Sequence, residues 1–281
     1  MATALSPPEC TREDVHVVED PRFSRERVCV VTGAASGIGR ALALAAAVNG
    51  LSVLATDVDE EGLGRTRERA EDLEEPDAIE TCVADLREEG EIRRIAEAAG
   101  EVGDVTYLAN VAGLQHVAPI ESFPTEAYDR LQDVMIRAPV LLTRELWPAL
   151  EVNEGCVGNM ASVHAHYVTR DKVAYNTAKF ALRGLTQSIA AEGDGDLRSF
   201  SVSTGYVATP LVTDQLAETA ERRDLDVDEV IEAVMLDQAR TTELMAPVEV
   251  ANLFVFGFSH LARHLNGGDL CFDGGITGSY E

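Results

Sequence analysis

The sequence predicts an α/β domain in which a doubly wound parallel sheet carries helices on both faces. From Val28 onward, short β-branched runs alternate with helical stretches, and a glycine-rich turn separates the first run from the first helix. Strands that alternate with helices form parallel sheets, because each crossover helix returns the chain to the same edge. With 281 residues and 46% hydrophobic residues, the chain has the length and apolar content for one such domain.

Seven runs are predicted as strands, namely 28–32, 51–56, 79–84, 105–109, 155–160, 200–204 and 270–272. Segments between them, such as 37–49 and 88–99, have helical residues and helical periodicity. The segment from 209 to about 245 has many charges, helical spacing and no strand signal, which predicts a small helical insertion acting as a lid. Residues 1–27 are interpreted as an acidic N-terminal extension, and 28–281 as a single domain.

Composition excludes several classes of function. The net charge of −26 argues against nucleic acid as a partner, because binding phosphates requires positive charge. No run approaches the roughly 20 apolar residues of a membrane span, and the first 27 residues lack the order of a signal peptide. The five cysteines form no C-x-x-C pair, and no Cys/His cluster has the spacing of metal ligands. We therefore expect a cytoplasmic protein with no membrane contact and no metal site.

The positive charges are unevenly distributed between arginine and lysine. Of the 23 basic residues, only Lys172 and Lys179 are lysine. Acidic surfaces poor in lysine resemble those of proteins from salt-loving organisms, where dense carboxylates keep the protein hydrated. A halophilic origin is therefore our interpretation, and the two remaining lysines are expected to have functions.

The first strand leads into the run TGAASGIG at 32–39, which opens the first helix. A strand, a glycine-rich turn and a helix start form the Rossmann-type arrangement that holds a dinucleotide pyrophosphate at the helix N-terminus. Asp57, just past the second strand, is placed to bind the adenosine ribose hydroxyls and to repel a 2′-phosphate, which predicts NAD. The alternative for Asp57 is a solvated loop acid. The cofactor residues predicted in the turn are Gly33, Ser36, Gly37, Ile38 and Gly39.

These motifs resemble the short-chain dehydrogenase/reductase family over nearly the whole chain after Val28. The spacing of the three glycines, the segment NVAG at 110–113, and Ser162 followed by Tyr175-x3-Lys179 all match family patterns. Gly205 and Thr209 match the turn on the nicotinamide side, and the segment DGG at 273–275 matches the closing strand. The resemblance implies a homotetramer and further cofactor contacts from Asp85, Asn110, Ala112, Gly113, Tyr175, Lys179, Gly205, Val207 and Thr209.

The catalytic chemistry follows from three side chains. Tyr175 and Lys179 are four residues apart and so share one helix face. We expect the ammonium to lower the pKa of the phenol, so that Tyr175 exchanges a proton with the substrate hydroxyl while hydride passes to nicotinamide. Ser162 would hold the substrate oxygen. Taken singly, these residues are equally explained as a core tyrosine, a surface lysine and a strand-end serine.

Two positions depart from the family pattern. Met135 stands where the family has an asparagine that holds a water linking the lysine to solvent, and a thioether is a weak acceptor. Thr204 replaces the usual proline before Gly205. These changes predict an altered proton relay. They also motivate an alternative, a catalytically weak NAD-binding regulatory protein, although the retained Ser162, Tyr175 and Lys179 argue against it.

The substrate half resembles the D-3-hydroxybutyrate dehydrogenases. The resemblance matches Gln115, His164, Lys172 and Gln215 to residues that hold the substrate carboxylate, and all four side chains can donate hydrogen bonds to a small anion. His116 and His166 are interpreted as structural. The expected function is reversible NAD-dependent oxidation of D-3-hydroxybutyrate, a small hydroxy acid, to acetoacetate. Taken singly, these residues are also explained as solvated loop glutamines and a polar strand end. The alternative function keeps the chemistry and changes the substrate to a sugar, polyol or 3-oxoacyl compound.

Overall fold

A seven-stranded parallel sheet forms the centre of the molecule. The computed structural model describes residues 10–213, 216, 220, 225–231, 235–237 and 239–278. Within this part of the chain the strand order is β3-β2-β1-β4-β5-β6-β7. The strands are β1 (Arg27–Thr32), β2 (Ser52–Asp57), β3 (Ile79–Val83), β4 (Asp104–Asn110), β5 (Cys156–Met160), β6 (Arg198–Thr204) and β7 (Gly268–Phe272). The predicted doubly wound sheet is confirmed, with strand boundaries shifted by a few residues at most.

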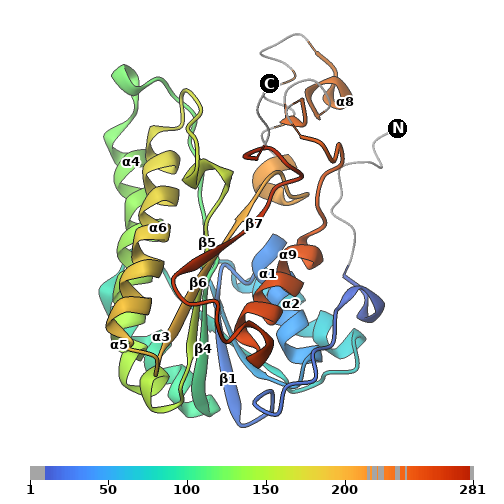
Figure 1. Cartoon of the computed structure of the whole chain (residues 1–281), viewed down its shortest axis with the longest axis vertical. Coiled ribbons are helices and arrows are strands. Elements are labelled where there is room, and N and C mark those ends of the chain that lie inside the picture. The colour runs from blue at the N-terminus through green and yellow to red at the C-terminus, as the bar shows by residue number, and fades with distance from the viewer. Residues whose placement is uncertain are drawn as a thin grey trace.

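Helices cover both faces of this sheet (Figure 1). One face carries α1 (Gly37–Val48), α2 (Glu60–Asp72) and α9 (Pro247–Phe258), and the other carries α3 (Glu89–Val102), α5 (Ala138–Val152) and α6 (Val173–Glu192). Alanines fill most of the buried side of α1, which lets α9 approach closely. Two separate apolar clusters, one on each face, make up most of the core. Because the strand order reverses between β1 and β4, the carboxyl ends of the strands leave a crevice there.

A π-helical segment interrupts the helix that approaches this crevice. The chain runs from α4 (Thr125–Gln132) through the π segment η3 (Asp133–Arg137) directly into α5. The amide of Ala138 donates to the carbonyl of Asp133, five residues back. Pro139 has no amide hydrogen and so cannot close the next α-helical turn on Met135. Such π segments are rare, and many lie at functional sites.

The described part of the N-terminal extension packs against the domain. After a short 3-10 helix, η1 (Arg12–Asp14), the backbone amide of Val18 donates to the side chain of Asn49 at 2.8 Å. The amide of His16 donates to Asn252 in α9 at 2.9 Å. The predicted extension therefore lies along the α1–α9 face as a bonded arm.

The predicted insertion at 209–245 is described only in part. It includes a helical turn at 210–213 and α8 (Val227–Val230), which lies beyond the sheet at the top of Figure 1. Leu216, Ala220 and Val230 form a small buried cluster of their own. A single bridge between Val207 and Met245 joins the two ends of the segment. Gln215, a predicted substrate residue, lies outside the described residues.

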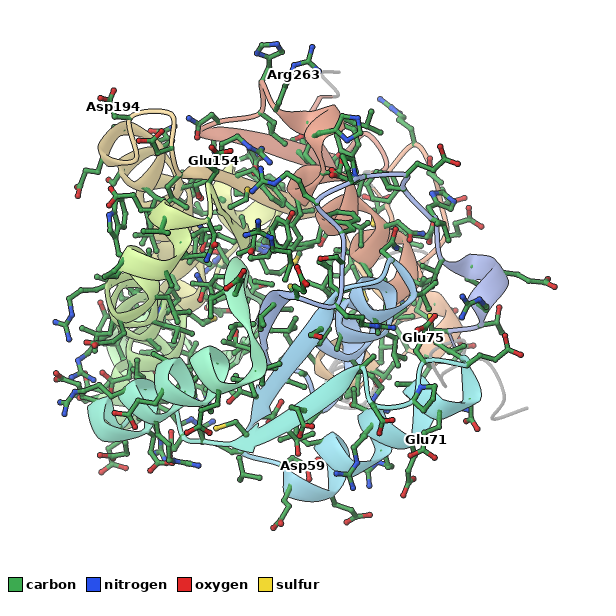
Figure 2. The ribbon with its side chains drawn as sticks, turned by 90° about the horizontal axis from the view of Figure 1, so that it is seen from below. Asp59, Glu71, Glu75, Glu154, Asp194 and Arg263 are labelled. Atoms are coloured by element: carbon green, nitrogen blue, oxygen red, sulfur yellow. The ribbon has the colours of Figure 1, made fainter. Side chains whose placement is uncertain are left out.

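The acidic side chains are distributed over the surface. Figure 2 shows Asp59, Glu71 and Asp194 projecting outward from a helix start, a helix end and a turn. Among the described helices, none combines the length and apolar character needed to cross a membrane. Within the same residues, no group of three or more His, Cys, Asp or Glu is arranged to hold a metal ion.

Candidate active site

A cavity of about 480 Å³ opens at the carboxyl ends of the strands. The glycine-rich turn, the ends of β2, β3 and β6, and the start of α6 line it. The structure brings nearly all of the predicted cofactor residues to its wall, namely Gly33, Ser36, Gly37, Ile38, Gly39, Asp57, Asp85, Ala112, Gly113, Tyr175, Lys179, Gly205, Val207 and Thr209. Asn110 lies behind the wall, where its side-chain amide donates to Asn159 at 2.9 Å.

The glycine-rich turn has room for a dinucleotide only because it lacks side chains. Gly33 has a φ of +71°, and a Cβ there would lie 2.8 Å from the Cα of Ala112. A Cβ on Gly39 would lie 2.0 Å from the carbonyl oxygen of Gly33. The turn therefore opens directly onto the N-terminus of α1, whose free amides suit a pyrophosphate. These residues fit a nicotinamide dinucleotide.

Asp57 connects the end of β2 to this turn. One carboxylate oxygen accepts from the amide of Ala35 at 3.1 Å, and the other accepts from Val58 at 2.7 Å and from Asp59 at 3.1 Å. These bonds fix a negative charge on the cavity wall. The nearby guanidinium of Arg40 is turned away from the cavity, toward Thr66 at 3.1 Å and the carbonyl of Ala35.

Asp85 forms an ion pair that the sequence analysis missed. The Nε of Arg87 donates to both oxygens of Asp85 at 3.0 Å, and both residues line the cavity. This hydrogen bond from Arg87 lowers the pKa of Asp85. The carboxylate is therefore ionised and held in place, while its role at the adenine edge stays a prediction. The sequence carried one signal for this ion pair, namely an aspartate and an arginine two residues apart directly after a strand.

The three predicted catalytic side chains meet at one end of the cavity. Ser162 follows β5 and begins the 3-10 helix η4 (Val163–Ala165), where it hydrogen-bonds to Tyr175 of α6. The Lys179 ammonium lies 5.3 Å from the centre of the Tyr175 ring. It donates to the carbonyl of Met160, at the end of β5, at 2.7 Å.

The prediction of a lowered pKa for Tyr175 is wrong, because the pKa of this phenol is raised. Burial raises the pKa of Tyr175 to about 12, although the hydrogen bond with Ser162 lowers it. Burial also lowers the pKa of Lys179 to about 8. The ammonium lies over the face of the ring and bonds the Met160 carbonyl, so loss of water around the phenol dominates.

His164 has protein partners at both ring nitrogens. Its Nδ1 lies 3.3 Å from the Ser162 hydroxyl, and its Nε2 lies 2.9 Å from the hydroxyl of Thr169. Burial, together with the charges of Lys172 and Lys179, lowers the pKa of His164 to about 4, so the imidazole is neutral near pH 7. The two lysines of the chain thus both lie near this imidazole. Its predicted substrate contact stays a prediction.

The predicted substrate residues Gln115, His164 and Lys172 are not among the residues that line the cavity. Lys172 precedes α6 and is half-buried, and burial lowers the pKa of its ammonium. In the part of the chain that the structure describes, no carboxylate forms an ion pair with Lys172. Gln115 lies in the loop after β4. His166 bonds Asp269 at 2.9 Å and His116 packs against Phe123, in keeping with structural roles.

Met135, which stands where the family has an asparagine, is an apolar core residue. It is fully buried in a cluster with Leu131, Ala174 and Ala178. Tyr175 packs against the same cluster. The side of the tyrosine that faces α4 and η3 is therefore apolar at this position.

A doubly wound sheet, a side-chain-free turn at a helix start and a Ser–Tyr–Lys group at one cavity define a nicotinamide-dependent oxidoreductase. A family model described as "Enoyl-(Acyl carrier protein) reductase" matches residues 33–277. The chain belongs to this family of short-chain dehydrogenases/reductases.

The chain is similar to oxidoreductases whose names refer to different hydroxyl compounds. An oxidoreductase of Bacillus subtilis, YxjF, is 33% identical over 90% of this chain and 99% of its own. A D-beta-hydroxybutyrate dehydrogenase of Rhizobium meliloti is 30% identical over 89% of this chain and 98% of its own. A solved structure described as an NAD(P)-dependent gluconate 5-dehydrogenase from Beutenbergia cavernae, with bound NADP, has a TM-score of 0.81 and 28% identity, over 92% of this chain and 100% of its own.

Proposed function

We propose that this protein is a dehydrogenase for a small hydroxy acid and that it interconverts D-3-hydroxybutyrate and acetoacetate with NAD. The observation that carries the proposal is the half-buried Lys172 ammonium, which has no ion-pair partner among the described residues and lies near His164, beside Ser162. A buried cation without a counter-ion is costly, and a substrate carboxylate supplies one. The likeness to the Rhizobium meliloti enzyme supports the same substrate class.

The chain's own residues perform the proton chemistry. The Ser162 hydroxyl holds the substrate oxygen, and Tyr175 takes the hydroxyl proton in oxidation or returns it in reduction. Because burial holds the phenol in its neutral form, the site is prepared to donate a proton to a ketone. When bound, the nicotinamide accepts or supplies the hydride. Lys179 places a positive charge over the Tyr175 ring, which favours the phenolate as it forms.

NAD is favoured over NADP by the charge at the end of β2. The Asp57 carboxylate faces the cavity where an adenosine ribose would lie, and Arg40 is turned away from it. A 2′-phosphate would meet the Asp57 carboxylate, while the Arg40 guanidinium is held by Thr66 and the Ala35 carbonyl. The Beutenbergia cavernae structure holds NADP, so both cofactors belong in the test.

A sugar acid or polyol is the second candidate, favoured by the likeness to the gluconate 5-dehydrogenase structure. The Lys172 ammonium suits gluconate as well as hydroxybutyrate, because both are carboxylates. A neutral polyol has no carboxylate with which the Lys172 ammonium could pair. A weakly catalytic NAD-binding regulator is the third candidate, and it predicts cofactor binding without turnover.

The deciding experiment is an NAD(P) reduction assay in molar KCl with both enantiomers of 3-hydroxybutyrate, gluconate, sorbitol and the methyl ester of 3-hydroxybutyrate. We expect the highest kcat/KM with D-3-hydroxybutyrate and NAD, and little activity with the neutral ester. Higher activity with sorbitol than with both acids would replace the proposal by the polyol alternative. Cofactor binding with no turnover of any compound would favour the regulatory reading.

We also propose adaptation to salt and assembly into a homotetramer. The charge of −26 and the presence of only two lysines support the first. The second is carried over from the family. Sedimentation of the protein in molar KCl measures the number of copies, and a monomer there contradicts the tetramer.

A further inference from the structure

A line of hydrogen-bonding groups runs from the reacting phenol toward the surface. Tyr175 bonds the Ser162 hydroxyl, Ser162 lies 3.3 Å from Nδ1 of His164, and Nε2 of His164 lies 2.9 Å from the hydroxyl of Thr169. Ser162 and His164 are buried, whereas Thr169 is half-buried. The line therefore begins at the site of chemistry and ends at a side chain that water reaches.

One direction of hydrogen bonding satisfies every atom in this line. The Ser162 oxygen accepts from the backbone amide of His164 at 3.2 Å, and it can also accept from its other partner, the Tyr175 hydroxyl. Its own hydrogen is then left for Nδ1 of the neutral imidazole, which carries its proton on Nε2 and donates it to Thr169. Hydroxyls and a neutral imidazole arranged in this way can each accept one proton and pass on another.

The position that departs from the family pattern offers Tyr175 a poorer exit for its proton. Met135 fills that place with a thioether, and it packs with Leu131, Ala174 and Ala178. A thioether donates no hydrogen bond and accepts weakly. The Lys179 ammonium donates to the Met160 carbonyl, which cannot carry a proton onward at neutral pH.

We propose that Ser162, His164 and Thr169 form the path by which the substrate proton reaches water in this chain. The inference rests on the proposed dehydrogenase function. In oxidation, Tyr175 passes its proton to Ser162, Ser162 passes its hydrogen to Nδ1, Nε2 passes its proton to Thr169, and Thr169 passes its hydrogen to water. One proton leaves for each hydride removed, and each hydroxyl keeps one hydrogen. The imidazole is then left with its proton on Nδ1. Loss of that proton to water and uptake of another at Nε2 restore the starting form, and reduction runs the transfers in reverse.

The surroundings keep His164 suited to such transfer. The rings of Tyr167 and Tyr175 lie 5.6 and 5.5 Å from its ring, and Lys172 and Lys179 are the charged groups that act on it. Their positive charges and the burial keep the imidazole neutral, so one nitrogen accepts while the other donates. The Asn176 side chain donates to the carbonyl of Thr169 at 2.8 Å, which fixes the outer end of the path.

The test removes the outer hydroxyl, which touches no reacting atom. Thr169→Val keeps the shape of the side chain and removes the hydroxyl that relays the proton, whereas Thr169→Ser keeps that hydroxyl. Thr177→Val makes the same substitution on the exposed side of α6 and is the matched control. With the best alcohol substrate, Thr169→Val should lower kcat by about tenfold or more, leave KM unchanged and raise the solvent deuterium isotope effect. Thr169→Ser and Thr177→Val should behave as wild type. Imidazole buffer should restore part of the lost rate, which it cannot do for a purely structural defect.

A second measurement needs no turnover. In protein labelled with ¹⁵N-histidine, exchange of the His164 ring N–H with water should slow at least about tenfold in Thr169→Val and stay unchanged in Thr177→Val. Unchanged kcat and unchanged ring exchange in Thr169→Val would overturn the path. If the protein oxidises no alcohol at all, the proposed function fails, and the ring exchange still decides whether His164 communicates with solvent through Thr169.

Discussion

The carboxylate of Asp57 accepts a hydrogen bond from the backbone amide of Ala35 at 3.1 Å, which ties the end of β2 to the glycine-rich turn. One side chain therefore shapes the turn and places a negative charge on the cavity wall. A substitution at Asp57 changes both properties, and a control must separate them.

Asp57→Ser should narrow the preference for NAD over NADP, measured as the ratio of the two kcat/KM values, by about tenfold or more. The reason is the loss of repulsion toward a 2′-phosphate. Asp59→Ser is the control, because Asp59 caps α2 through the amide of Gly62 at 3.0 Å and does not line the cavity. It should leave the cofactor ratio unchanged and change Tm little, because serine caps a helix about as well as aspartate does. Equal use of both cofactors by the wild type would remove Asp57 from the proposed site.

Lys172→Ala should raise KM for hydroxy acids and change kcat less. A hydrogen bond to a charged group contributes about 1.5–3 kcal/mol, or roughly 10- to 150-fold in kcat/KM, and it is present in ground and transition states alike. Burial lowers the pKa of Lys172, and the group is charged only below that pKa. KM for the acids should therefore rise as pH rises through it. If the methyl ester loses as much activity as the acid, the carboxylate contact is wrong.

Lys179→Met should stabilise the protein near pH 7 while it abolishes turnover. Burial lowers the pKa of Lys179 to about 8 from 10.5, so folding works against the charged form. That cost is fully present below pH 8 and disappears between pH 8 and about 10.5. The Tm advantage of the variant should therefore shrink over the same interval. A variant less stable than wild type at pH 7 would show that the bond to Met160 outweighs burial.

Met135→Asn should raise kcat for oxidation at the acidic end of the pH profile. Burial raises the pKa of Tyr175 to about 12, so loss of its proton limits the rate most strongly at low pH, and a new polar exit relieves that limit. Leu131→Asn is the matched control, because Leu131 is buried in the same cluster. It should lower Tm without any gain in rate. An unchanged profile in Met135→Asn indicates that proton exit already proceeds fast enough elsewhere.

Tm should climb steeply with KCl from dilute to molar concentrations. Self-repulsion at a net charge of −26 opposes the compact state, and the Debye length shrinks from ~10 Å at 0.1 M to ~3 Å at 1 M. Sucrose at matched osmolality controls for general stabilisation and should have a much smaller effect. A flat profile in KCl would falsify the halophile interpretation.

The sequence predicted the sheet and most of the cavity wall because both depend on the backbone. Gly33 and Asp57 lie where strands end, and parallel strands bring those ends to one edge. The pKa of Tyr175 was predicted with the wrong sign, because the spacing to Lys179 gives proximity but not burial. The contact of His164 with Thr169 depends on how a loop folds back, which spacing alone does not show.

The π-helical segment between α4 and α5 was not predicted either, although Pro139 carried a signal for it. Such a segment holds one more residue than an ordinary turn and is, in effect, an insertion absorbed inside a helix. Each residue of an α-helix turns the axis by about 100°. Removing one residue from Asp133–Arg137 would therefore leave a continuous helix whose α4 half is rotated by that angle. Leu131 would then leave the core beside Tyr175, so we expect this segment to tolerate substitution far better than a change of length.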